Sequence, residues 1–104
     1  MKLTFDPDKD AANIFKHGLS QADSMLVFDA PNKLTLESTQ QDEARLMDIA
    51  MVELAGVVLV LVYVLRQPDK LRAISSRRAS KQERTLYAES IREAHWHRLG
   101  TSQA

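Results

Sequence analysis

The part of this chain best suited to chemistry is a run of basic residues at positions 71–87, LRAISSRRASKQERTLY. The whole chain has a formal net charge of zero, so this run is a local cationic site. Its single acidic residue is Glu83, serines lie between the basic positions, and the basic residues are Arg72, Arg77, Arg78, Lys81 and Arg84. Guanidinium and hydroxyl groups donate hydrogen bonds to phosphate oxygens. RNA is therefore the first ligand that this pattern suggests.

RNA can be cut when its own 2′-hydroxyl attacks the neighbouring phosphate, which requires stabilisation of negative charge and transfer of protons. Arg77, Arg78 and Arg66 are the catalytic candidates for stabilising that charge. Because side chains alternate along a strand, Arg77 and Arg78 would point apart if one strand runs through both. Further contacts with RNA are predicted for Lys16, Arg45, Arg72, Lys81 and Arg84.

His17 is the residue best suited by type to act as general acid or base, because its ordinary pKa of about 6.5 allows proton exchange near neutral pH. It also stands at the end of a predicted helix, where the helix dipole stabilises a histidine that has no catalytic role. Glu83 is either a base or, with Ser80, part of a capping box. Any single arginine is equally well explained by pairing with a carboxylate on a solvated face. The sequence leaves these alternatives open.

Metal and cofactor chemistry find no support in the sequence. The chain has no cysteine, which excludes a thiolate nucleophile and Cys-ligated zinc. His95 and His97 are two residues apart on a predicted helix, so they point in different directions. No phosphate-binding glycine loop or Ser-His-Asp set is present. We therefore predict no metal and no cofactor.

The bulk composition is that of one ordinary globular domain, with 104 residues and 44% hydrophobic content. The longest apolar run, residues 54–65, is shorter than the roughly 20 residues that a membrane-spanning helix needs. The N-terminus has no apolar run of the signal-peptide type. We expect a cytoplasmic protein without membrane contact, with one domain at residues 1–97 and a flexible tail at 98–104.

The hydrophobic periodicity predicts an α+β fold in the order β-α-α-β-β-β-β-α. Asp6-Pro7 begins the first helix and Gly18 ends it. The predicted elements are a strand at 2–5, helices at 7–17 and 20–28, strands at 33–37, 45–53, 57–64 and 71–76, and a helix at 81–96. We expect the helices to pack on an antiparallel sheet. The apolar residues expected to face it are Ala11, Ile14 and Phe15 of the first helix and Leu86, Tyr87, Ile91 and Ala94 of the last.

Two short patches also match a known family in their order and spacing. They are KHG at residues 16–18 and ISSRRA at residues 74–79, supported by Phe5-Asp6, Arg45, Val62-Tyr63 and Tyr87. With these residues the chain resembles the BrnT family of type II toxin–antitoxin systems, which are small ribonuclease toxins with a RelE-like fold. It departs from the family pattern at Gln21, where an aromatic residue is usual, and at Ala50, where glycine is common.

The resemblance implies a RelE-like domain that cleaves RNA and so inhibits translation. It also implies a cognate BrnA-like antitoxin with a ribbon-helix-helix DNA-binding part, so that operator DNA would be contacted indirectly, through the antitoxin. Cleavage would be independent of metal. The alternative is a catalytically inactive family member that serves as an antitoxin-binding or RNA-binding module.

Overall fold

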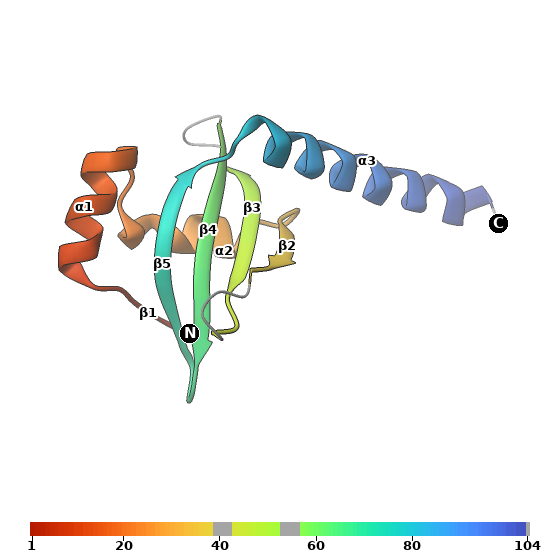
Figure 1. Ribbon diagram of the computed structural model, residues 1–104. Helices are drawn as coiled ribbons and strands as arrows, with labels where there is room; N and C mark the ends of the chain where they lie inside the picture. Colours follow the sequence, from red (N-terminus) through yellow and green to blue (C-terminus); the bar gives the residue numbers. More distant parts are fainter. Residues whose placement is uncertain (39–42, 53–56, 104) are drawn as a thin grey trace.

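The structure is a computed structural model that describes residues 1–38, 43–52 and 57–103, with side chains described as far as residue 94. The elements follow the predicted order (Figure 1). They are β1 (Lys2–Thr4), α1 (Pro7–His17), the 3₁₀ helix η1 (Gln21–Asp23), α2 (Ser24–Phe28), β2 (Leu34–Glu37), β3 (Leu46–Val52), β4 (Val57–Arg66), β5 (Lys70–Arg78) and α3 (Lys81–Gln103). The α+β class is confirmed.

Three elements are longer than the sequence pattern predicts. β4 continues to Arg66 instead of ending at Val64. β5 continues through both Arg77 and Arg78, and α3 continues to Gln103. Glu53, the predicted end of a strand, lies outside the described residues, as do the side chains of His95 and His97. The division into a domain at residues 1–97 and a flexible tail at 98–104 stays a prediction.

The sheet is mixed, whereas the sequence pattern predicted an antiparallel one. Its strand order is β1-β5-β4-β3-β2, and β1 pairs with β5 in parallel while the other pairs are antiparallel. The β4–β5 hairpin leaves the outer edge of β5 open, and β1 covers the start of that edge, where the Lys2 N–H donates to the Asp69 carbonyl at 2.9 Å. Alternation of side chains identifies a strand but does not give its direction relative to its neighbours.

Helix α1 lies beside the edge of β5 instead of over the sheet (Figure 1). Its ends are as predicted: Asp6 caps the first turn, and Gly18 takes the left-handed conformation at φ 69°. The buried residue of the helix is Asn13, however, while Ala11, Ile14 and Phe15 are exposed, and the Phe15 side chain is 94% exposed. The predicted packing face is therefore wrong, because a helix at a strand edge meets backbone polar groups and buries a side chain that can bond to them.

The main core lies between the sheet and α2, on the back of the sheet in Figure 1. It contains Val27 of α2 and, from the strands, Ala50, Val52, Leu59, Leu61, Tyr63, Leu71 and Ala73. A buried carboxylate, Asp48, lies within this layer and accepts hydrogen bonds from Lys33 at 2.8 Å, Thr35 at 2.6 Å and Tyr63 at 3.1 Å. These three donors offset the cost of burying the charge.

The front face of the sheet, toward the viewer in Figure 1, is not crossed by any helix of the described residues. Its apolar residues form a second cluster around Ile49 and Val60, which are shielded by neighbouring side chains and by Tyr87 at the start of α3. Beyond its first turns α3 extends away from the sheet (Figure 1). Tyr87 and Ile91 are half-buried as predicted, but Leu86 and Ala94 are exposed, because the helix leaves the domain before it can bury a wider face.

Candidate RNA-binding surface

Three polar side chains of β5 lie in one column on the front face, namely Arg72, Ser75 and Arg77. They pair in register with alternate residues of β4, Val64, Val62 and Val60, which share one face of the sheet. Arg72 and Arg77 are five residues apart and would point to opposite faces of a regular strand. The register shift at Val62/Tyr63 leaves Ile74 as an extra residue in β5 and so brings both arginines to the front face.

Arg77 is held by a bidentate ion pair with Glu83 of α3, at 2.7 and 2.8 Å. Glu83 also accepts from the Ser80 N–H at 2.8 Å, while its own N–H donates to the Ser80 hydroxyl, so the predicted capping box is confirmed. The Arg77 hydrogen bonds, helped by those from Ser80, lower the pKa of Glu83 to about 2. The same hydrogen bonds raise the pKa of Arg77. This pair joins the end of β5 to the start of α3.

A second basic group lies at the opposite end of β5, near the β4–β5 turn. Arg66 and Arg72 line a shallow cavity of about 380 Å³ together with Thr4, Gln67 and Lys70, so these two arginines share one end of the sheet. Glu43 lies 3.2 Å from Arg66 and 3.7 Å from Arg45. Five residues of strand span about 16 Å, so this group and Arg77 would contact different phosphates.

Arg78 and His17 lie away from the front face. Arg78 pairs in register with Leu59, a residue of the back-face core, and its side chain is exposed at the end of the sheet. β5 thus runs through Arg77 and Arg78 and points them apart, so the two do not act as one group. His17 is half-buried, one helical turn beyond Asn13 on the same side of α1. Asn13 of α1 bonds to Ser76 of β5. His17 follows Asn13 in the helix and Arg78 follows Ser76 in the strand, and both stand at the last position of their element.

Two buried amides bind the exposed edge of β5 beyond the reach of β1. Asn13 donates to the carbonyls of Ser76 at 2.9 Å and Leu19 at 2.6 Å and accepts from the Ser76 N–H at 3.3 Å. Gln21 donates to the carbonyl of Ile74, the extra residue, at 2.6 Å. These side chains form hydrogen bonds with backbone groups of the strand edge that would otherwise be free to pair with a strand of another molecule. Sequence reasoning missed Gln21's role because local patterns contain no signal for a contact across 53 residues.

The remaining predicted RNA contacts lie at the ends of helices. Lys16 is exposed in the last turn of α1, and Lys81 is exposed in the first turn of α3. Arg84 is also exposed and donates to the Ala79 carbonyl at 3.0 Å. Lys81 and Arg84 therefore extend the basic surface around Arg77, while Lys16 belongs to the α1 side.

Within the described residues, no three His, Asp or Glu side chains come together as a metal site would require. None of the helices described there is long and apolar enough to cross a membrane.

Together, the mixed five-stranded sheet, the arginine column on its front face and the flanking N-terminal helices define a small α+β domain with a cationic surface. Residues 5–83 match the family described as ribonuclease toxin, BrnT, of type II toxin–antitoxin system, and the chain belongs to that family. The fold is similar to the crystal structure of the Brucella abortus ribonuclease toxin BrnT, with a TM-score of 0.62 and 29% sequence identity over 78% of this chain and 99% of that one. No protein with curated function matches the chain.

Proposed function

We propose that this chain is a metal-independent endoribonuclease toxin that cuts RNA in the cytoplasm, thereby inhibits translation, and is neutralised by a ribbon-helix-helix antitoxin. The proposal rests on its family and on one observation above all: the β-bulge at Ile74 places Arg72, Ser75 and Arg77 in one column on the front face. A column of two guanidinium groups with a hydroxyl between them suits the backbone of a single RNA strand, whose phosphates repeat along its length.

RNA binding begins with Arg72 and Arg66 at one end of the column and continues toward Arg77. Three of the five N–H donors of Arg77 are engaged, two by Glu83 and one more by the Arg78 carbonyl, so the guanidinium still has donors for a phosphate oxygen. Lys81 and Arg84 extend the cationic surface past this point. Arg45 is a further RNA contact beside Arg66, since Glu43 lies close to both arginines.

We place the scissile phosphate at the end of β5, between Arg77 on the front face and Arg78, with His17 reaching it from the end of α1. The RNA 2′-hydroxyl attacks this phosphate, and the arginines stabilise the extra negative charge that develops. His17 transfers the proton, because an imidazole can both accept and donate a proton in general acid–base catalysis. Lys16, beside it in sequence, binds a flanking phosphate.

The antitoxin covers the same front face. Its arginine column borders apolar residues such as Met47 and Val62, and this combination suits a partner segment that carries both carboxylates and apolar side chains. Operator DNA is then reached through the antitoxin alone.

The test is RNA integrity after brief induction in cells that lack the antitoxin. Wild type should cleave RNA, and Arg72→Ala or Arg77→Ala should reduce cleavage about 10- to 100-fold, the effect of losing one charged hydrogen bond. Arg92→Ala is the matched control, because Arg92 is an exposed arginine of α3 outside the column. Co-expression of the adjacent antitoxin should restore intact RNA.

Purified protein provides the metal test, because cleavage should persist in excess EDTA. Loss of cleavage in EDTA would refute metal independence without affecting the rest of the proposal. Intact RNA in cells that contain folded, well-expressed wild type would instead identify an inactive antitoxin-binding module.

A further inference from the structure

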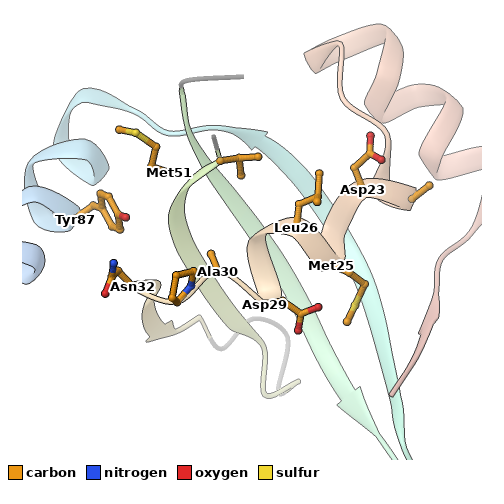
Figure 2. Close-up of a pocket in the computed structure, with 11 residues that line it drawn as sticks. Asp23, Met25, Leu26, Asp29, Ala30, Asn32, Met51 and Tyr87 are labelled. Carbon is orange, nitrogen blue, oxygen red and sulfur yellow. The ribbon is translucent and has the colours of Figure 1, made fainter. Parts of the chain in front are cut away.

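A groove of about 870 Å³ lies beside α2 and the first turns of α3, and no arginine of the column lines it. It lies between α2, the loop before β2, the end of β3 and the first turns of α3 (Figure 2). Figure 2 shows Met51 and Tyr87 on one side of it and Leu26 and Met25 on the other. The family match ends at residue 83, in the first turn of α3, and Tyr87 of the next turn forms one wall of the groove.

The groove offers apolar surface that the fold does not cover. Leu26 is 46% exposed and Met51 is 50% exposed, although both stand in elements that contribute to the core. Methionine side chains adapt their shape to different apolar partners, which suits them to a docking surface. An uncovered apolar groove of this size, bordered by polar groups, is typical of a site that receives side chains from another molecule.

The charged residues that line the groove are both acidic. Asp23 and Asp29 line it, and no Lys, Arg or His is among its lining residues. Neither carboxylate forms an ion pair or side-chain hydrogen bond with the rest of the described chain. Five basic residues lie instead on the front face or at the β5–α3 junction, namely Arg72, Arg77, Arg78, Lys81 and Arg84. An RNA phosphate would be repelled from the groove, and a cationic apolar ligand would be attracted.

We propose that this groove binds an amphipathic helix of a partner protein, with leucine-like side chains inserted between Leu26, Met51 and Tyr87 and with Lys or Arg side chains paired to Asp23 and Asp29. Such a helix presents an apolar stripe flanked by charge, and helix-in-groove recognition uses residues at i, i+3, i+4 and i+7 as anchors. The proposal does not depend on ribonuclease activity, since binding is measured without RNA.

The methionines of the chain are suitable reporters for the test. Met25 and Met51 line the groove, whereas Met47 belongs to the front-face cluster. The probe is a synthetic leucine–lysine peptide of amphipathic helical pattern, titrated into protein labelled with ¹³C at the methionine methyl groups. We expect NMR shifts at Met25 and Met51 and not at Met47. The affinity of a matched leucine–glutamate peptide should be at least about tenfold lower.

Charge-reversed variants separate specific docking from simple hydrophobic contact. Asp23→Lys/Asp29→Lys should weaken binding of the lysine peptide about tenfold. The control is Glu37→Lys/Glu89→Lys, which changes the net charge equally at exposed positions outside the groove and should change the affinity less than about threefold. Leu26→Ser/Met51→Ser should abolish binding of the lysine peptide, and circular dichroism should confirm that this variant is folded.

Three results of the peptide titrations would overturn the proposal. They are equal affinity for the two peptides, shifts centred on Met47, and unchanged affinity of the Asp23→Lys/Asp29→Lys variant. Concentration-dependent dimerisation in sedimentation, removed by Leu26→Ser/Met51→Ser, would likewise overturn it by identifying a second copy of the chain as the occupant.

Discussion

The contact between Arg77 and Glu83 makes a strong prediction about stability, because it joins the last residues of β5 to the first turn of α3. The Arg77 hydrogen bonds lower the pKa of Glu83 from 4.5 to about 2. At about 1.36 kcal/mol per pKa unit, a change of this size corresponds to at most ~3.4 kcal/mol of stability. The Glu83 and Arg77 side chains are 15% and 29% exposed, so water screens the pair. We therefore expect about 1.5 kcal/mol.

The perturbation is Glu83→Gln, which removes the charge and keeps an oxygen that can accept from the Ser80 N–H. Because the pKa of Glu83 is lowered in the folded state, the stabilisation is fully present above about pH 4.5 and is lost as the pH falls toward about 2. Urea unfolding followed by circular dichroism should show the variant about 1.5 kcal/mol less stable than wild type at pH 7, and this difference should shrink toward zero near pH 2.

The control is Glu89→Gln, an exposed position of the same helix, which should change stability by less than about 0.5 kcal/mol. A double-mutant cycle with Arg77→Ala should assign most of the Glu83 effect to the pair. The reasoning fails if the two glutamine variants are equally stable at pH 7, or if the Glu83→Gln difference stays constant down to pH 2.

Three further predictions concern the residues that hold the fold. Asn13→Ala should cost about 2–4 kcal/mol in urea unfolding, because it leaves the buried N–H and carbonyl of Ser76 unpaired; an effect below about 1 kcal/mol would show that water replaces the amide. In an absorbance titration at alkaline pH, Tyr63 should ionise well above the ordinary tyrosine pKa, since burial and then the Asp48 carboxylate raise it, and Tyr63→Phe should remove that late component. Gly18→Ala should lower the free energy of unfolding by about 1 kcal/mol because of its positive φ, and Gly18→Asn by less, which thermal melts can compare.

Local patterns were sufficient to predict the helix ends and the order of the elements. The Asp6 cap, the Gly18 stop and the Ser80–Glu83 capping box depend on residues two to four apart in the chain, and all of them are confirmed. The same reasoning was wrong for the packing of α1, since Phe15 faces solvent. Helical periodicity shows which residues share a side of a helix, but not which side meets the protein.

The grouping of the candidate site needed the tertiary structure. The sequence shows that Arg72, Arg77 and Arg78 are close along the chain, and it correctly warns that the last two alternate. It contains no signal for the extra residue at Ile74, and without that residue Arg72 and Arg77 would lie on opposite faces. The bidentate pairing of Arg77 with Glu83 was also unpredicted, because it depends on the angle at which α3 leaves β5.

For this protein, then, the amino-acid sequence was enough to identify the family, the class of fold and the cationic character of residues 71–87. The family follows from the resemblance carried by the KHG and ISSRRA patches, whereas the fold class and the cationic run follow from composition and from spacing within a few residues. Only the folded chain decides which arginines share a face, that Asn13 and Gln21 complete the edge of β5, and that an apolar groove with two carboxylates lies between α2 and α3. These features arise from contacts between distant segments, whose geometry depends on strand register and helix direction.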